Sequence, residues 1–119
     1  MKKVFAVMLI TVLLAAGCGS SNMDFAVDTA PDFKEGQTSD FIIKVTDEGK
    51  GVTGLSVMAT LEMAKMDHGT IEVAMKDIGG GQYKGSVQLA MSGEWIADIK
   101  VESGSKTIEK ILTFEVKER

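Results

Sequence analysis

Apolar and polar residues alternate with a period of two along most of the chain after residue 22. Successive side chains of a β-strand point to opposite faces, so this alternation predicts strands with one face toward a core and one toward water. We expect seven strands, at about residues 23–29, 38–46, 53–63, 70–77, 82–91, 94–102 and 106–116. Glycine- and serine-rich turns separate them, including a hairpin turn at Gly79-Gly80-Gly81.

Seven short strands at this spacing predict an all-β fold, a seven-stranded antiparallel immunoglobulin-like β-sandwich. Trp95 and Phe41 are the expected large side chains of its core. Met75 and Met91 follow the inward period of their strands, which predicts that both are core residues.

The amino terminus has a different pattern. Two lysines follow Met1, residues 4–16 carry no charge, and Ala15-Ala16-Gly17 precede Cys18, the one cysteine of the chain. A short basic region, an apolar stretch of this length and small residues at its end predict a secretory signal, not a membrane span. A cysteine directly after Ala-Ala-Gly resembles a bacterial lipoprotein signal, which implies cleavage before Cys18 and its lipidation. The alternative is an ordinary signal peptide with an incidental cysteine.

This interpretation divides the chain into a signal peptide (1–17), a lipidated Cys18 with a short linker (18–22) and one domain (23–119). The expected location is extracytoplasmic, with a lipid anchor in a bacterial membrane: the outer membrane of a two-membrane host, or the cell surface of a one-membrane host. Removing 17 of 119 residues leaves 102, enough to bury a core without disulfides.

Charge and motifs argue against several function classes. The chain has a net charge of −4, and loss of Lys2 and Lys3 makes it about −6, which is unfavourable for binding nucleic acid. A single histidine, no free thiol after lipidation, and no HExxH or GxSxG motif indicate that the protein is not an enzyme.

The segment 63–69, Met-Ala-Lys-Met-Asp-His-Gly, is chemically unusual because two thioethers and the one imidazole lie within six residues. Thioether sulfur favours Cu(I), and imidazole binds copper in either oxidation state. Counting antiparallel strands places Met91 and the 30–37 loop at the same end of the sandwich. The candidate copper ligands are therefore Met63, Met66, His68 and Met91. The alternative is that the methionines fill the core and that His68 is an ordinary turn residue.

Several spaced motifs resemble one family. They are Val45-Thr46-Asp47, Gly51-Val52, the segment 61–69, Gly81-Gln82-Tyr83 and Met91-Ser92-Gly93-Glu94-Trp95. Together they are similar to the YtkA-like domain, which is related to FixH-like proteins. The resemblance extends from about Met23 to Val116. Ala64 stands where the family commonly has proline, so the loop lacks the stiffness that proline would add.

The resemblance implies an immunoglobulin-like sandwich in a small bacterial lipoprotein. It also implies a link to copper handling or to haem–copper oxidase assembly, with Met63, Met66 and His68 matching the methionine-rich loop and Met91 and Trp95 the later motif. We therefore expect a tethered protein that binds Cu(I) for buffering or for delivery to a membrane acceptor, such as a copper transporter or an oxidase under assembly. The alternative is a metal-independent interaction module that uses Lys65, Met66 and Phe33 as contacts.

Overall fold

The computed structural model describes residues 23–67 and 69–119, and these residues form eight β-strands. Their bounds are β1 Met23–Thr29, β2 Ser39–Asp47, β3 Lys50–Gly51, β4 Ser56–Met63, β5 Ile71–Gly79, β6 Gln82–Val87, β7 Gly93–Ser103 and β8 Lys106–Val116. All pairs between these strands are antiparallel. Within the described residues we find no helix that is long and apolar enough to cross a membrane.

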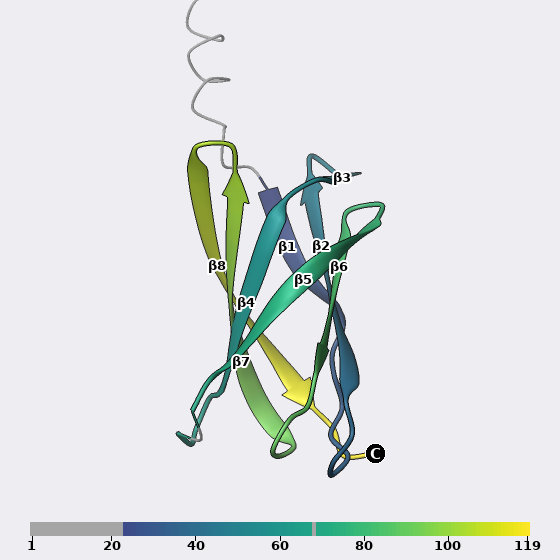
Figure 1. The fold of residues 1–119 in the computed structure, drawn as a ribbon, viewed down its shortest axis with the longest axis vertical. Helices are drawn as coiled ribbons and strands as arrows, with labels where there is room; N and C mark the ends of the chain where they lie inside the picture. The colour runs from purple at the N-terminus through teal and green to yellow at the C-terminus, as the bar shows by residue number, and fades with distance from the viewer. Residues whose placement is uncertain (1–22, 68) are drawn as a thin grey trace, which may run out of the picture.

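The strands follow the order β1-β2-β6-β5-β4-β7-β8, with β3 paired to the end of β2 (Figure 1). β5 connects the two sheets of the sandwich, because residues 71–75 pair with β4 while Lys76, Asp77 and Gly79 pair with β6. One sheet contains β1, β2, β3 and β6, and the other contains β4, β7 and β8. A parallel bridge between Phe33 and Glu118 joins the segments that follow β1 and β8. The predicted antiparallel immunoglobulin-like β-sandwich is confirmed.

Most strands begin and end within two residues of their predicted bounds, but β4 and β6 are shorter and β3 was not predicted. β4 begins late because Gly54 has a φ of 77°, outside the strand region. β6 ends at Val87, although the buried side chain of Leu89 continues the apolar alternation beyond the strand. The alternation therefore overestimated the length of this strand.

The prediction that Met91 is a core residue is wrong, because its side chain is 40% exposed. The inward alternation stops after Leu89, since Met91 lies in the loop before β7 and no longer in a strand. Met75 is buried, as predicted, because it lies within the regular part of β5.

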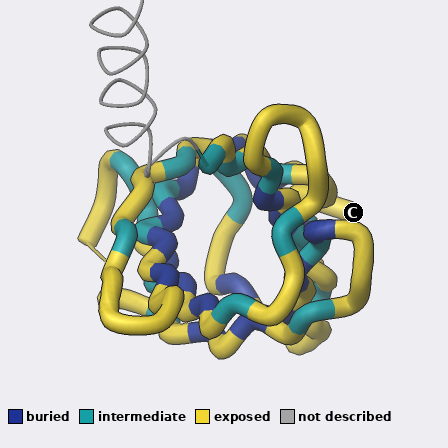
Figure 2. Tube along the Cα trace, turned by 90° about the horizontal axis from the view of Figure 1, so that it is seen from above, coloured by how far each residue is buried: buried dark blue, intermediate teal, exposed yellow. Residues whose placement is uncertain are grey.

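Buried residues alternate with exposed ones along the strands and face the interior between the two sheets (Figure 2). Trp95 and Phe41, the predicted anchors, are 2% and 0% exposed. The rings of Phe41 and Phe114 stack with their centroids 5.1 Å apart, which joins the two sheets through the core. Burial of such apolar side chains is the main stabilising contribution to a fold that has no disulfide within its described residues.

Gly85 explains how β5 passes from one sheet to the other. A Cβ added at this glycine would lie 2.8 Å from the sulfur of Met75 and closer still to a methyl group of Val73. Any side chain at position 85 would therefore displace the β5 residues that pack over the backbone of β6. The glycine allows β5 to cover β6 at the place where the two strands are not hydrogen-bonded.

Tyr83 and Asp77 hold the connection between β3 and β4 against the hairpin formed by β5 and β6. The fully buried Tyr83 donates its hydroxyl hydrogen to the Val52 carbonyl (2.8 Å) and accepts a hydrogen bond from the Leu55 amide (3.2 Å). The Asp77 carboxylate accepts hydrogen bonds from the amides of Gly54 and Gly79, both at 2.8 Å. These contacts replace strand pairing in a segment whose backbone groups would otherwise lack partners.

Candidate functional site

Three loops lie at one end of the sandwich: residues 30–38 between β1 and β2, 64–70 between β4 and β5, and 88–92 between β6 and β7 (Figure 1). We call this end the methionine pole. The opposite end contains Met23 and the turns at 48–49, 80–81 and 104–105, and we call it the amino-terminal pole. Their position at the same end follows from the antiparallel order that the sequence predicted.

Met63 is the last residue of β4 and pairs with Trp95 of β7. Its partly buried side chain packs against the core, and its terminal methyl group would lie 3.9 Å from a Cβ added at Gly93. Met63 therefore borders both the core and the surface of the methionine pole, and its side chain lies on the same face of the sheet as that of its cross-strand partner Trp95.

The loop after Met63 forms one side of a surface depression of about 370 Å³. Its lining residues are Glu62, Met63, Ala64, Lys65, Met66, Asp67 and Ile96. The Ala64 amide donates a hydrogen bond to the Glu94 carbonyl at 3.0 Å, which holds the start of the loop against β7. Met66 is 52% exposed, so its thioether is accessible from solvent.

The loop turns at Asp67 and Gly69. The Asp67 carboxylate accepts a hydrogen bond from the Gly69 amide at 3.1 Å, and Gly69 has a φ of 86°, which favours glycine. His68, between them, lies outside the described residues, as does the predicted lipidation site Cys18.

Met91 reaches the methionine pole from the third loop, but it does not line the depression. Its carbonyl accepts a hydrogen bond from the indole nitrogen of Trp95 at 3.2 Å. Of the predicted ligands that the structure describes, Met63 and Met66 therefore share one depression, and Met91 lies outside it.

In residues 23–67 and 69–119, no three His, Cys, Asp or Glu side chains form a group that could hold a metal ion. The methionine thioethers are a different class of ligand from these side chains.

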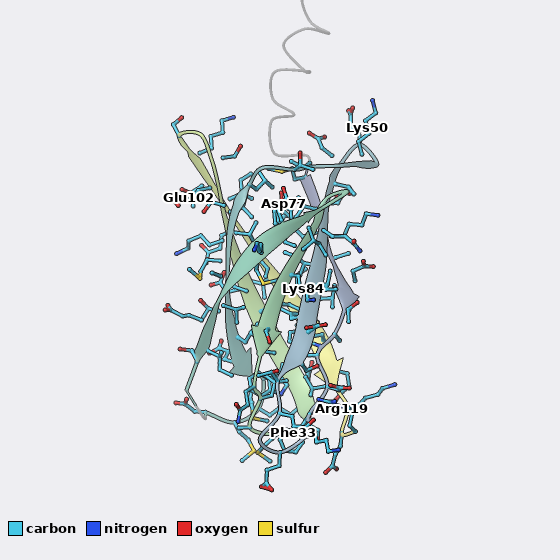
Figure 3. The ribbon with its side chains drawn as sticks, turned by 45° about the vertical axis from the view of Figure 1, so that its right-hand side comes forward. Phe33, Lys50, Asp77, Lys84, Glu102 and Arg119 are labelled. Atoms are coloured by element: carbon cyan, nitrogen blue, oxygen red, sulfur yellow. The ribbon has the colours of Figure 1, made fainter. Side chains whose placement is uncertain are left out.

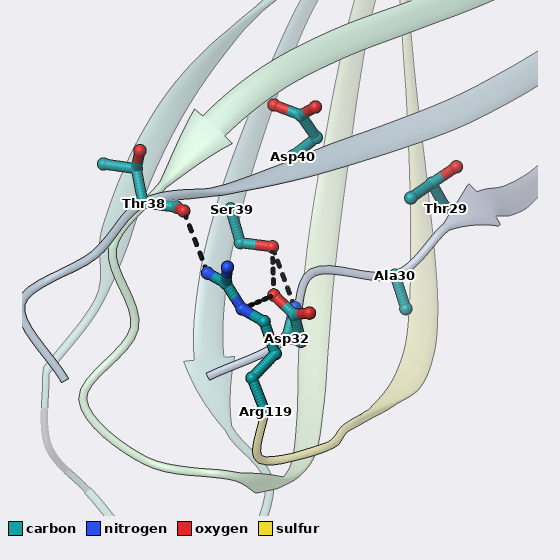
Figure 4. Close-up of a pocket in the computed structure, with 7 residues that line it drawn as sticks. All are labelled: Thr29, Ala30, Asp32, Thr38, Ser39, Asp40 and Arg119. Carbon is teal, nitrogen blue, oxygen red and sulfur yellow. Dashed lines mark hydrogen bonds and ion pairs between the residues drawn. The ribbon is translucent and has the colours of Figure 1, made fainter. Parts of the chain in front are cut away.

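A second depression at this end, of about 330 Å³, was not predicted from the sequence (Figure 4). Asp32 is its central group: its carboxylate accepts a hydrogen bond from the Ser39 hydroxyl at 2.7 Å and pairs with the Arg119 guanidinium at 3.0 Å. Arg119 also donates a hydrogen bond to the Thr38 carbonyl at 3.3 Å. No sequence pattern pointed to this cluster, because Asp32 and Arg119 are far apart in the chain and meet only in the fold.

The groups with shifted pKa values lie away from the methionine loop. Hydrogen bonds from the amides of Gly54 and Gly79 lower the pKa of Asp77, and burial raises the pKa of the Tyr83 hydroxyl. On the outer face of β7 and β8, a hydrogen bond to Asp98 and the charge of that residue raise the pKa of Glu109. The first two groups belong to the amino-terminal pole, where they have a structural role.

The chain is similar to known proteins in sequence and in fold. The sequence profile of the YtkA-like family matches residues 19–100, which include β1 to β6 and most of β7. No curated protein sequence matches the chain. Among solved structures, a DUF4426 family protein from Pseudomonas aeruginosa superposes with a TM-score of 0.62 at 12% identity, over 83% of this chain and 94% of that one.

A second solved structure, the endo-beta-1,4-mannanase from Thermotoga petrophila, has a TM-score of 0.47 at 14% identity. The match includes 84% of this chain but 21% of the mannanase. At these identities the likeness to the DUF4426 family protein concerns the fold, and the likeness to the mannanase carries no argument.

Proposed function

The chain belongs to the YtkA-like family, and from this premise we propose that it is a lipid-anchored extracytoplasmic protein that binds Cu(I) at the methionine pole. It would buffer the ion or deliver it to an acceptor. The observation that supports the proposal is the position of Met63 and Met66 in one surface depression, with Met91 in another loop at the same pole.

The chemistry of these side chains supports copper over other metals. A thioether is a soft, uncharged ligand that favours Cu(I), whereas Ca²⁺, Mg²⁺ and Zn²⁺ prefer oxygen, nitrogen or thiolate ligands. The exposure of Met66 suits exchange of the ion, because an incoming ligand can reach the metal without opening the core. The proposed site consists of Met63, Met66, Met91 and His68, of which His68 is assigned from the sequence alone.

The proposed anchor rests on the sequence of residues 1–18, which resembles a lipoprotein signal that ends at Cys18. A lipidated chain would be held at the membrane surface and would act on copper in the aqueous layer beside it. We infer a binding protein without catalytic activity, since the proposed ligands are soft donors and include no nucleophile with an adjacent base.

One observation favours a second candidate function, a metal-independent interaction module. Met66 and Met91 expose apolar side chains at the same pole, by 52% and 40%, and methionine adapts well to partner surfaces. Lys65 and the partly buried Phe33 would then contribute to the contact. A complex that persists in a strong copper chelator would support this candidate.

The test is an anaerobic Cu(I) titration of residues 22–119 against a chromogenic Cu(I) chelator, with Trp95 emission recorded in parallel. We expect stoichiometric binding with a change in Trp95 emission, because Met63 pairs with Trp95 and the indole is hydrogen-bonded to Met91. Binding should weaken in Met66→Ala and His68→Ala.

The matched control is Met58→Ala, which removes a thioether of similar exposure (44%) from the outer face of β4, away from the pole. The control should bind as the wild type does. Failure of the wild type to compete with the chelator would overturn the copper proposal and leave the interaction module.

A further inference from the structure

The start of the domain and the methionine loop lie at opposite ends of the sandwich (Figures 1 and 3). Met23, the first described residue, pairs with Asp47, directly before the turn that leads to Lys50 at the amino-terminal pole. Met63 ends β4 at the other pole, and Figure 3 shows Phe33 at that end and Lys50 at the opposite one. The domain is therefore joined to Cys18 at its amino-terminal pole, opposite the methionine pole.

The length of the connecting segment limits how the domain can turn. Five peptide links separate Cys18 from Met23, and a fully extended chain spans about 3.5 Å per residue, or roughly 17 Å in total. The longest strands have 11 residues, and a strand rises by about 3.3 Å per residue, so the domain is about 30 Å or more from pole to pole. The connection is too short to run along the domain and bring the methionine pole to the bilayer.

We propose that the anchored domain presents its methionine pole to the aqueous compartment, away from the membrane that holds it. This inference rests on the proposed function for its anchor at Cys18. The occupant of the pole is then a protein domain in the aqueous layer that carries its own soft sulfur or imidazole ligand. Transfer would be a ligand exchange: a sulfur atom of the partner binds Cu(I) as a thioether of this chain leaves, with no change of oxidation state.

Charge on one broad face disfavours the arrangement in which the domain lies flat. Most of the charged residues at the outward positions of β4, β7 and β8 are carboxylates, namely Glu62, Glu94, Asp98, Glu102, Glu109 and Glu115, and one is a cation, Lys100. An acidic face is repelled by an anionic lipid surface, and the repulsion acts within roughly a Debye length of about 8 Å. The face therefore favours an upright domain over one that rests on this sheet.

The experiment uses the full chain, expressed in a bacterium, purified with its lipid and reconstituted in phosphatidylcholine vesicles that contain phosphatidylglycerol. Two matched variants each replace an exposed charged residue by cysteine: Glu35→Cys at the methionine pole and Lys50→Cys at the amino-terminal pole. Lipidation of Cys18 leaves the introduced cysteine as the single free thiol for a fluorophore. Energy transfer to a dye on the lipid headgroups then reports the height of each pole above the bilayer.

We expect strong transfer from position 50 and much weaker transfer from position 35, which corresponds to a height difference of about 30 Å. Equal transfer from both positions would mean that the domain lies flat and would overturn the proposal, as would stronger transfer from position 35.

Flotation with the vesicles separates this inference from the proposed function. A chain that does not float has no lipid anchor, and that result would overturn the inference while the Cu(I) titration still decides the metal site.

For the wild-type chain loaded with Cu(I), a water-soluble chelator should remove the ion at the same rate with and without vesicles. A rate that vesicles slow severalfold would show that the bilayer shields the pole and would contradict the proposal.

Discussion

Replacement of Tyr83 by phenylalanine should destabilise the domain by about 2 kcal/mol. The change keeps the buried ring and removes a hydroxyl that bonds to the Val52 carbonyl at 2.8 Å and to the Leu55 amide at 3.2 Å. Each such bond contributes about 0.5–1.5 kcal/mol, and a buried partner left unsatisfied adds to the loss. Two such bonds together contribute about 1–3 kcal/mol. Because Val52 and Leu55 are only partly buried, water can replace part of each lost bond, and the expected loss is the middle of this range, about 2 kcal/mol.

The assay is urea unfolding followed by the emission of Trp95, the one tryptophan of the chain. A loss of about 2 kcal/mol corresponds to a fall in Tm of roughly 8–16 °C for a domain of this size. Ser86→Ala, an exposed position on the same strand, is the matched control and should change stability by less than about 0.5 kcal/mol. A loss below about 0.5 kcal/mol in Tyr83→Phe would refute the view that this hydroxyl holds the segment between β3 and β4.

The same variant has a pH signature. Burial raises the pKa of Tyr83 in the folded state, so its contribution to stability is complete below the unfolded pKa of about 10 and is lost as pH rises through the folded value. The difference in stability between wild type and Tyr83→Phe should therefore shrink at strongly alkaline pH. Because Tyr83 belongs to the amino-terminal pole, the variant should bind Cu(I) like the wild type, and weakened binding would show that the two poles are coupled.

Three further predictions concern single residues. Asp77→Ala should be less stable than wild type in urea unfolding at pH 7, and this difference in stability should be smaller at pH 3. The pKa of Asp77 is lowered in the folded state, so its contribution to stability is present above the unfolded pKa of about 4 and is lost as pH falls through the folded pKa. Gly85→Ala should lose about 1–3 kcal/mol in the same assay, since its methyl group would meet Met75, and a variant as stable as wild type would contradict this. Met63→Leu should retain the fold within about 1.5 kcal/mol but bind Cu(I) at least about tenfold more weakly in the chelator titration, whereas Met58→Leu should not.

The fold was predictable because its dominant signal is local. Alternation of apolar residues predicted the bounds of β1 and β8 and the burial of Phe41 and Trp95, all of which the structure confirms. The prediction failed where the alternation continued past a strand end, as at Met91, and where a very short strand such as β3 has no repeat to detect. The sequence did not predict Tyr83 as a core residue. A tyrosine can be buried when its hydroxyl finds hydrogen-bond partners, and the partners of Tyr83 lie on another segment of the chain.

The candidate site was predictable only in part. The unusual composition of the segment 63–69 marked the loop, and antiparallel strand order placed Met91 at the same pole. Whether thioethers share a depression depends on how loops pack, and the structure brings Met63 and Met66 together while Met91 stays outside. The cluster of Asp32, Ser39 and Arg119 had no sequence signal, because its members come from separate segments.

The sequence by itself determined the fold class, the inward face of most strands and the family of this protein, because those depend on periodicity and on motifs of neighbouring residues. The tertiary structure decided how β5 joins the two sheets, which glycine makes that crossing possible, and which of the methionines share a depression. These features are contacts and directions between residues distant in the chain. They depend on the packing of side chains from different strands, which a local pattern does not contain.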